Sequence, residues 1–350
     1  MFRYLIIVKP LGLMYGSAGG FLSPENLVGQ SRSKFPPDAA TLSGLIFSQS
    51  KAENEGKAQD ERNAIQEDLR KNVRVGGPFW AEYDSYFDFY VPIPWLYQVK
   101  KHERDPKPKN NQLNYWKIGD KGWELDQKDD DFTPEFSWQP ISAWNDREAI
   151  RENAAAAPWK FVPLLHPHLK DEERNVKKND GLFLEYAVQL PEEYCLIYLS
   201  TVAIAPGWYR FGGENHLVEI ESEKLDEDDP IVELFQQKID RAFASIAPGV
   251  WGSNRFSYRY PQHPDFPEPS HLLTDKPIPY RYRTGNNTYQ LGGSLGRGRY
   301  AVPPGSVYLL ERSLNRSWWD WDNAWFPKEG FPLNHLGCGL ALPLQIEGVS

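Results

Sequence analysis

Residues 34–49 read KFPPDAATLSGLIFSQ, and this stretch decides how the chain begins to fold. Two consecutive prolines, Pro36 and Pro37, favour an extended approach, and Asp38 is of a residue type preferred at a helix N-cap. The apolar residues at 42, 45 and 46 then fall on one helical face. We therefore predict a short helix after Asp38, with Gly44 beside that face, where it would let the helix lie close to a sheet.

The segment before this helix is strand-like. Phe2 to Val8 is an almost continuous apolar run, and a loop that contains Arg32 and Lys34 connects it to the helix. The chain thus opens as a strand, a basic loop and a helix. This is a common βα unit, which by itself specifies no function.

The composition is that of a soluble protein with a sizeable core. At 350 residues the chain is long enough for about two domains. No apolar run reaches the length of a membrane span, and the N-terminal run is too short for a secretory signal, so we expect a soluble cytoplasmic protein. Abundant proline (29) and glycine (27), with 14% aromatic residues, favour short strands joined by long structured loops.

Charge and cysteine content limit the function classes. A net charge of −9 and a pI of about 5.4 argue against a free-standing nucleic-acid-binding protein, which is usually basic, but they leave room for a local basic surface. Cys195 and Cys338 are the only cysteines, and they give neither a disulfide framework nor a zinc spacing. We expect two reduced, buried thiols.

The N-terminal half alternates polar and aromatic segments. Residues 51–71 carry charges at helical spacing and predict one solvated helix, which Gly76-Gly77-Pro78 ends. Residues 79–99 are dense in aromatic residues and predict a strand pair. Residues 100–136 predict an inserted polar loop, partly disordered in the free chain, and residues 141–156 a short connecting helix.

The C-terminal half is richer in strands. Strands are predicted at residues 181–190, 194–204 and 306–311, and a glycine turn that enters a last strand is predicted at residues 336–344. A glycine turn within residues 208–220 leads into a further strand. Residues 231–246 have the apolar spacing of an amphipathic helix.

Four segments, in this order, resemble the RAMP superfamily of CRISPR effector subunits. They are the first strand with the Phe35-Pro-Pro helix, the strand at Asp180-Gly-Leu-Phe183, the turn Phe211-Gly-Gly-Glu-Asn-His-Leu-Val218, and the closing pair Pro304-Gly-Ser-Val-Tyr308 with Gly337-Cys-Gly339. Together they resemble the five-type subunit of type III CRISPR effectors, and most closely the third subunit of the Cmr (type III-B) complex.

This resemblance implies an α+β fold with two ferredoxin-like (RRM-like) RAMP domains, glycine-rich loops and long inserted loops. The expected N-terminal domain is residues 1–160, with the polar insert at about 100–136. The expected C-terminal domain is residues 161–350, with an aromatic loop at about 316–330.

The same resemblance implies a non-catalytic subunit of an antiviral ribonucleoprotein. The subunit would hold the 5′ handle of the CRISPR RNA, dock the large polymerase-like subunit and contact the backbone RAMP subunits. We expect no catalytic residue, no metal, no cofactor and no membrane partner. The predicted RNA-binding residues are Lys9, Arg32, Lys34, His166, His168, Arg174, Lys177, Lys178, Arg210, Arg281, Arg283, Arg297, Arg299, Gly337 and Gly339.

Several of these residues are also suggested by local pattern. From Lys276 to Arg316 the sequence has seven basic residues and one acidic residue, a local charge of +6. Arg281 and Arg283 alternate with tyrosines, so that in a strand the arginines share one face. Arginines on phosphates and aromatic rings, such as Tyr15 or Tyr282, on bases form the usual single-stranded RNA surface. A strand with solvated arginines and buried tyrosines explains the pattern equally well.

Two glycine loops offer backbone contacts to phosphate. Gly337 and Gly339 would present outward N–H groups, and the loop at residues 292–299 would add Arg297 and Arg299 beside its glycines. The alternatives are a plain tight turn at residues 337–339 and a flexible solvated loop at residues 292–299.

Histidines give weaker signals. His166 and His168 alternate, but no Cys, Asp or Glu cluster completes a metal site. Residues 170–180 hold four basic and four acidic residues and more plausibly lie along RNA. His216 could act as a general acid-base group, although a structural role is the simpler interpretation. Phosphate-binding Walker and Gly-x-Ser-x-Gly patterns are absent from the sequence.

A second hypothesis is a carbohydrate-binding or carbohydrate-active protein. It rests on 13 tryptophans and on carboxylates beside aromatic residues, above all Asp320 and Asp322 within the loop from Trp318 to Trp325. This loop is equally consistent with a satellite core or with an anchor into a neighbouring subunit.

Overall fold

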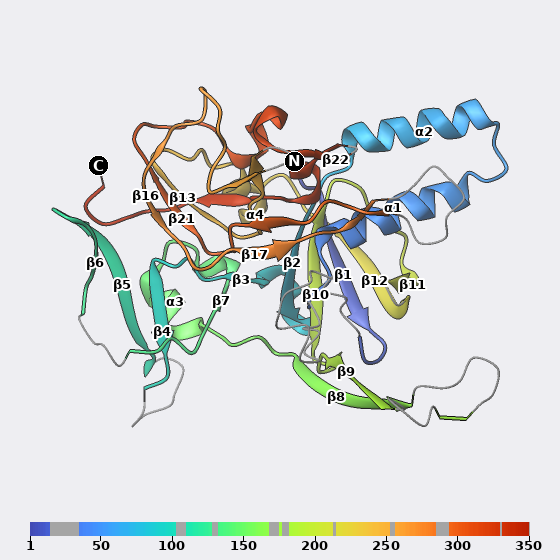
Figure 1. Cartoon of the computed structure of the whole chain (residues 1–350), viewed down its shortest axis with the longest axis horizontal. Coiled ribbons are helices and arrows are strands. Elements are labelled where there is room, and N and C mark those ends of the chain that lie inside the picture. Colours follow the sequence, from blue (N-terminus) through green and yellow to red (C-terminus); the bar gives the residue numbers. More distant parts are fainter. Residues whose placement is uncertain are drawn as a thin grey trace.

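The computed structural model describes residues 1–14, 35–102, 110–127, 132–167, 175–176, 182–212, 215–252, 256–284, 294–329 and 331–349. Antiparallel sheets dominate this part of the chain, and helices are few. Figure 1 shows a strand-rich body from which two helices, α1 and α2, extend on one side.

The largest sheet has seven strands in the order β11-β12-β1-β10-β2-β3-β7. Their bounds are β1 Tyr4–Pro10, β2 Val75–Glu82, β3 Tyr90–Pro92, β7 Trp138–Pro140, β10 Tyr194–Ser200, β11 Gly207–Phe211 and β12 His216–Lys224. Four consecutive residues of β1, Leu5 to Val8, are each at most 1% exposed. Both faces of the sheet are therefore covered at its centre, which explains the uninterrupted apolar run.

Helix α1 (Ala39–Glu53) begins directly after Asp38, as predicted. Its Leu42 and Ile46 are buried, whereas the Asp38 side chain makes no capping hydrogen bond to the helix. Gly44 is exposed, and no atom lies within 4 Å of where its Cβ would be. The prediction that Gly44 permits close approach to the sheet is therefore wrong.

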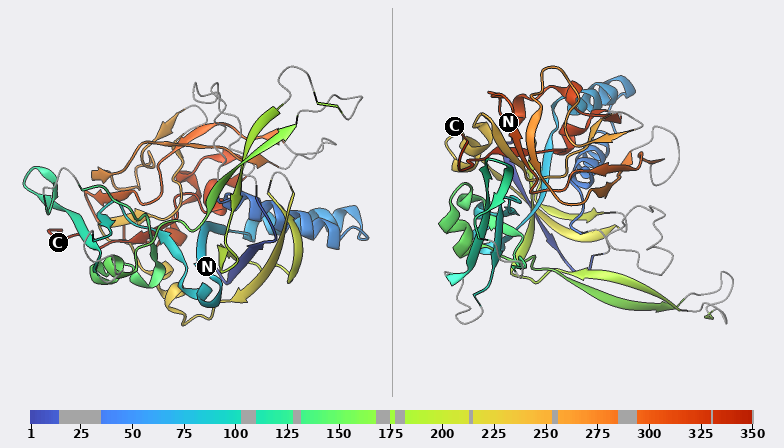
Figure 2. Two further views of the ribbon diagram at one scale, coloured as in Figure 1. Left: turned by 90° about the horizontal axis from the view of Figure 1, so that it is seen from below. Right: turned by 60° about the vertical axis from the view of Figure 1, so that its left-hand side comes forward.

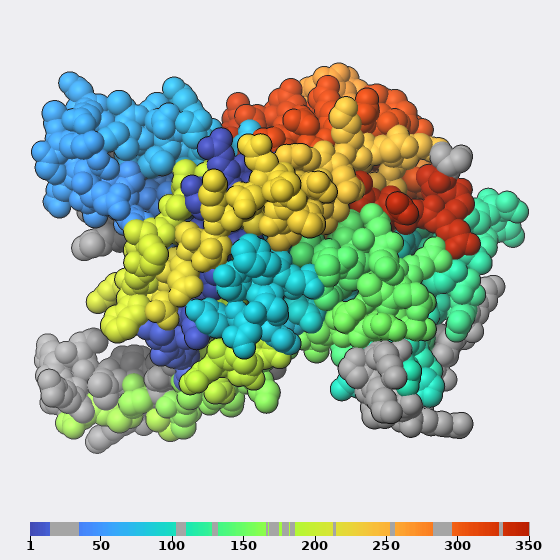
Figure 3. Space-filling view, turned by 180° about the vertical axis from the view of Figure 1, so that it is seen from behind, coloured from blue at the N-terminus to red at the C-terminus, as the bar shows by residue number. Residues whose placement is uncertain are grey.

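The charged segment that follows forms a separate helix, α2 (Gln59–Asn72), so the prediction of one helix over residues 51–71 is wrong. The chain leaves the α1 helix at Asn54, whose side chain donates to the Ser50 carbonyl (2.7 Å), and residues 54–56 form a turn. No residue of α2 is buried. Figure 3 shows the α1–α2 pair standing away from the body, so α2 is the solvated helix that its composition indicates.

A second sheet has four strands in the order β16-β21-β13-β24. Their bounds are β13 Ala242–Ser245, β16 Pro269–Leu273, β21 Val307–Leu310 and β24 Ala341–Pro343. At its centre the rings of Phe243 and Tyr308 stack with centroids 4.5 Å apart. These strands bear out the strand predictions near residues 306–311 and 336–344.

The predicted helix over residues 231–246 is only half right. Helix α4 (Pro230–Gln236) begins at Asp229, whose carboxylate accepts from the Ile231 N–H at 2.8 Å. The chain then leaves the helix and enters β13. A short apolar segment that is buried on both sides suits a helix and a strand equally, so spacing alone could not find this boundary.

Both sheets contain the same strand arrangement. Four adjacent strands of the first sheet lie in the order β12-β1-β10-β2. Numbered by their sequence along the chain, these strands have the order 4-1-3-2, and each neighbouring pair is antiparallel. The second sheet repeats the order 4-1-3-2 with β24, β13, β21 and β16. This is the strand order of a βαββαβ unit.

The crossovers of the two arrangements differ. The first contains α1 between its first two strands. In the last crossover of the second, the helical elements of the described residues are short 3-10 turns, η5 (Trp318–Asp320), η6 (Asn323–Trp325) and η7 (Leu333–Leu336).

The predicted domain boundary at residue 160 does not follow these sheets. Strand β10 comes after this boundary, yet it lies between β1 and β2. The boundary therefore divides a single sheet, and the chain between β2 and β10 is an insertion into the first unit.

Part of this insertion is the segment predicted to be a polar loop. Two strands of this segment, β5 (Gln112–Gly119) and β6 (Gly122–Leu125), form a three-stranded sheet with β4 (Tyr97–Lys100), which ends where the predicted loop begins. Asn114 is 1% exposed, and its side chain bonds the backbone of Gln127 in both directions. The loop prediction is wrong here because internal polar bonds replace the apolar alternation that marks a strand. The turn η4 (Ile141–Ala143) and α3 (Arg147–Asn153) form the predicted connector.

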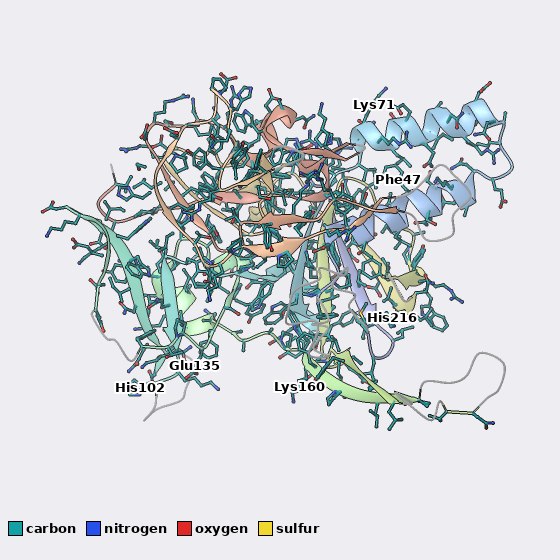
Figure 4. All side chains as sticks on the ribbon, in the orientation of Figure 1. Phe47, Lys71, His102, Glu135, Lys160 and His216 are labelled. Carbon is teal, nitrogen blue, oxygen red and sulfur yellow. The ribbon has the colours of Figure 1, made fainter. Side chains whose placement is uncertain are left out.

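The insertion also contains a long hairpin, β8 (Lys160–Pro167) with β9 (Leu182–Gln189), which we call the arm. The arm projects from the body in both views of Figure 2, and Figure 4 marks Lys160 where it leaves the body. Its base is fixed by Met14, whose backbone exchanges two hydrogen bonds with Val188.

The remaining elements are η2 (Tyr83–Asp88) and the short pairs β14 (Trp251–Gly252) with β15 (Ser257–Tyr258), β17 (Ile278–Tyr280) with β20 (Arg299–Ala301), β18 (Arg283–Thr284) with β19 (Ser294–Leu295), and β22 (Lys328–Glu329) with β23 (Phe331–Pro332).

Candidate nucleic-acid interface

Several predicted RNA-binding residues lie outside the part of the chain that the structure describes. The residues outside the described part of the chain are Arg32, Lys34, His168, Arg174, Lys177 and Lys178, together with the stacking candidate Tyr15. For His166 and Arg283 only the backbone is described, opposite Phe183 in the arm and Leu295 in β19 respectively. Their roles stay predictions.

Lys9 lies at the end of β1 in an acidic surrounding. Its Nζ is 4.1 Å from the centroid of the Tyr83 ring, and its strand partner is Glu219. The Tyr83 hydroxyl donates to Glu221 at 3.2 Å, and burial together with this carboxylate raises the pKa of Tyr83. Lys9 thus lies over an aromatic ring and opposite a glutamate of the neighbouring strand, and its role as a phosphate contact stays a prediction.

Arg210 lies on the edge strand β11 and is exposed. It pairs with Leu217 across the hairpin, and Trp208, which is 70% exposed, lies two residues away on the same strand. Figure 4 marks His216 at the turn of this β11–β12 hairpin. The hairpin therefore presents one arginine beside apolar side chains.

The basic segment at residues 276–302 folds as a hairpin of β17, β18, β19 and β20. Its three described arginine side chains have different environments. Arg281 is half-buried and its Nε donates to the Gly296 carbonyl at 2.7 Å, so it ties the two sides of the hairpin together. Arg297 is exposed, whereas Arg299 is only 6% exposed. The prediction that Arg299 lies on a binding surface is wrong in this structure, because its position in β20 alternates inward.

The glycine loop at residues 337–339 is also buried. Gly337 and Gly339 have φ of 71° and 63°, and a Cβ on either would collide, with Gly76 and Val75 or with the ring of Trp251. Their N–H groups donate to the carbonyls of Asn334 and Pro248 respectively. The predicted outward N–H groups are therefore wrong, and the tight-turn interpretation is confirmed.

The structure reveals exposed aromatic residues that the sequence analysis did not single out. Phe256, Tyr258 and Tyr300 are 62%, 40% and 52% exposed, and we call these three residues the aromatic patch. Arg259 beside them is exposed as well. The signal was present in the sequence as Arg255-Phe-Ser-Tyr-Arg-Tyr260, where aromatic residues and arginines interleave.

The arm carries an uncharged face. Residues opposite one another in an antiparallel pair point to the same side, so one face of the arm contains Phe161, Pro163, Leu165, Pro167, Leu182, Tyr186 and Val188. Phe161, Leu165 and Leu182 are 48%, 63% and 60% exposed. No charged residue interrupts this face, which therefore suits an apolar protein partner better than a phosphate backbone.

The tryptophan loop is part of the core. Trp318, Trp321 and Trp325 are each 3% exposed. Trp318 stacks on Phe2, and Trp321 lies edge-on to Phe243 with centroids 5.4 Å apart. The satellite-core interpretation is confirmed, and these rings are not available for stacking on a sugar.

The described residues contain no group of three or more His, Cys, Asp or Glu that could hold a metal ion. Cys195 and Cys338 are buried, and burial raises the pKa of each thiol to about 12, which keeps both protonated.

One groove, of about 1000 Å³, lies between α1 and α2. It is lined by polar residues of both charge signs, among them Glu55, Arg62 and Glu67, and no predicted site residue contributes to it.

Within the described part of the chain, no helix combines the length and the apolar character needed to cross a membrane.

Comparison with solved structures finds chains from type III CRISPR effector complexes. One, from the type III-B Cmr-beta complex bound to cognate target RNA, is 11% identical over 87% of this chain and 86% of its own length, with a TM-score of 0.48. Another, from a Csm1–Csm4 cassette in complex with pppApA, is 12% identical over 89% and 88%, with a TM-score of 0.38. A third, from the Csm3–Csm4 subcomplex of the type III-A interference complex, is 10% identical over 89% and 94%, with a TM-score of 0.38.

Similarity at this level assigns the chain neither to a family nor to a function. No family model and no curated protein matches the chain.

Proposed function

We propose that the chain is a non-catalytic, RNA-binding subunit of a type III CRISPR effector complex. In this proposal it is a RAMP protein of the five type, closest to the third subunit of the Cmr complex, and it works in the cytoplasm in antiviral defence. It holds the 5′ handle of the CRISPR RNA and docks the large polymerase-like subunit and the backbone RAMP subunits.

The observation that carries the proposal is the repeated strand order. Two antiparallel sheets with the order 4-1-3-2 in one chain are what a pair of ferredoxin-like RAMP domains requires. The sequence resemblance implies such a pair independently of the coordinates. Between β13 and β24 the described residues form no α-helix, which is a departure from the simplest form of this arrangement.

The basic hairpin supports the RNA-binding part. Residues 276–302 contain five basic residues and no Asp or Glu, in a chain whose net charge is −9. Such a segregated charge attracts a polyanion locally while the rest of the surface remains acidic. Arg297 is an exposed residue of this hairpin.

The arm supports the role as a subunit. A two-stranded hairpin is marginally stable on its own in water, and this one keeps leucines and a phenylalanine exposed along one face. Burial of that face against a neighbouring protein would remove this apolar surface from water. The proposal assigns the face to contacts within the effector complex.

The RNA-binding part is tested by removing the charges of three predicted RNA-binding residues together. The variant Arg32→Gln, Lys34→Gln, Arg297→Gln is expressed with a tag in the native host, and the RNA retained per complex is measured. We expect a clear loss of RNA with the partner proteins still present. A control variant, Lys51→Gln, Lys57→Gln, Arg70→Gln on the α1–α2 pair, should retain RNA. Equal retention in both variants would show that the mapping onto these residues is wrong.

A further inference from the structure

The aromatic patch is compact. Phe256 and Tyr258 are two residues apart, so that their Cα atoms are at most about 7 Å from each other. The Tyr300 N–H donates to the Ser257 hydroxyl at 3.1 Å, which joins β20 to β15 between the two other aromatic residues. Phe256 directly precedes β15, Tyr258 lies in β15 and Tyr300 lies in β20, so the three exposed residues come from neighbouring stretches of backbone.

The position of one ring is set by a glycine. Gly252 pairs with Ser257 in β14–β15 and has a φ of 102°. A Cβ at this position would lie 2.6 Å from Cδ2 of Tyr258, so the ring occupies the space above the glycine. The strand pairing thus holds Tyr258 at the surface, where it remains 40% exposed although it is opposite the buried Trp251.

The two segments that carry the aromatic patch contain charges of one sign. Arg259 directly follows Tyr258, and Arg297 lies three residues before Tyr300; both are exposed. Neither residues 250–264 nor residues 276–302 contain an Asp or Glu. The bond from Arg281 to the Gly296 carbonyl fixes the turn that carries Arg297.

We propose that the aromatic patch is a stacking platform for unpaired bases of a single-stranded nucleic acid, with phosphates held by Arg259 and Arg297. This deepens the proposed function and rests on it in taking RNA as the ligand. Every base has a π face, so such a platform holds bases without reading their identity. A protein partner is less favoured, because carboxylates that would pair with a partner's cations are absent from both segments.

The test measures binding of the purified full chain to a fluorescent oligouridylate of about 12 nucleotides. Phe256→Ala, Tyr258→Ala and Tyr300→Ala are each expected to weaken binding by about 5-fold or more, while the slope of log affinity against log salt stays unchanged. Arg297→Gln should instead lower that slope by about 0.7, because one phosphate contact is lost. Tyr300→Phe keeps the ring and should retain most of the affinity.

Two controls make the result specific. Phe87→Ala removes an aromatic ring that is 43% exposed in η2, and it should leave binding unchanged. An oligomer with abasic sites in place of uracil keeps the phosphates. It should bind equally to the wild-type chain and to the triple alanine variant, which combines Phe256→Ala, Tyr258→Ala and Tyr300→Ala. Circular dichroism and urea unfolding check that each variant is folded.

The outcomes separate this proposal from the function on which it rests. If the wild-type chain binds uracil and abasic oligomers equally, the platform is overturned but RNA binding stands. If the triple alanine variant keeps full RNA affinity but no longer co-purifies with a partner protein, the patch is a protein contact and the platform is overturned. If the wild-type chain does not bind the oligomer even at low salt, both proposals fail.

Discussion

At the scale of single residues, the aromatic and glycine positions are fixed mainly by burial. The indole N–H groups of Trp318, Trp321 and Trp325 are buried, and the described residues provide none of them with a hydrogen-bond partner. An unsatisfied buried N–H costs about 1–3 kcal/mol. A tryptophan side chain buries about 150–250 Å² of mainly apolar surface, which outweighs that cost. These residues therefore act as core residues, despite their position in an irregular segment.

We predict that Trp321→Ala lowers the free energy of unfolding by about 3–5 kcal/mol, because it leaves a large cavity beside Phe243 and Phe266. Trp208→Ala is the matched control, since this ring is 70% exposed, and it should change stability by no more than about 0.5 kcal/mol. Urea unfolding followed by far-UV circular dichroism measures both. Similar stability of the two variants would contradict the assignment of the tryptophan loop to the core.

Replacing each of two glycines by alanine should change the free energy of unfolding in opposite directions. Gly337→Ala forces a Cβ to 2.8 Å from the backbone of Val75 and Gly76 at a φ of 71°, and we expect a loss of at least about 1 kcal/mol. Gly44→Ala lies in α1 with no atom near the new Cβ, and we expect a gain of about 0.5–1 kcal/mol. Thermal unfolding distinguishes them. Destabilisation by Gly44→Ala would restore the idea that this glycine permits close contact.

His335 should make the fold sensitive to acid. It is 6% exposed, and burial, followed by the positive charge of Arg74, lowers the pKa of His335 to about 4. The unfolded state, with a histidine pKa near 6.5, then binds more protons between about pH 4 and 6.5. Stability should fall through this window as the pH decreases, by up to about 3 kcal/mol.

The measurement is guanidinium unfolding at about pH 7 and about pH 5. His335→Gln carries no titrating ring, so its stability should depend less on pH than that of the wild type over this window. An acid dependence as steep in the variant as in the wild type would assign the effect to other groups.

At the scale of elements, prediction from sequence worked where one pattern dominated. The run Phe2–Val8 could only be a buried strand, and the Pro-Pro-Asp approach fixed the start of α1. It failed where two structures satisfy the same pattern, as in residues 231–246, and where side chains bond the backbone, as Asn114 does in β5. Glycine content indicated tight backbone turns, but it could not tell whether such a turn faces solvent or the core, because that depends on contacts distant in sequence.

The candidate site, too, could be predicted from the sequence only in part. The segregation of basic residues at 276–302 is visible in the sequence, yet only the structure shows that Arg299, in β20, is buried and that Arg297, which precedes this strand, is exposed. The inward position of Arg299 follows from its pairing with Tyr280 between β17 and β20, a register that the sequence does not specify.

The arm provides a prediction at this scale. Leu165→Lys with Leu182→Lys should leave the stability of the isolated chain within about 0.5 kcal/mol of the wild type, because both side chains are more than half exposed. The same variant should lose its protein partners in a pull-down from the native host, since it places two charges on the apolar face. Leu217→Lys, on the exposed face of β12, is the control. Retention of all partners would remove the arm from the assembly interface.

At the scale of the whole molecule, the net charge of −9 conceals an uneven distribution. Residues 216–236 contain eight acidic residues and one lysine, whereas residues 276–302 contain five basic residues and no acidic one. Local attraction for a polyanion is therefore compatible with an acidic protein. On the proposed function we expect the isolated chain to bind RNA weakly and in a salt-dependent manner, and a complex that surrounds the RNA to strengthen the binding.

The central claim is that this chain holds CRISPR RNA within an effector complex. The most direct measurement is to express a tagged copy in the native host, purify it gently and sequence the RNA that accompanies it. The account predicts short RNAs that share one repeat-derived 5′ handle, together with several partner proteins. A pure monomer without RNA and without partners would contradict it.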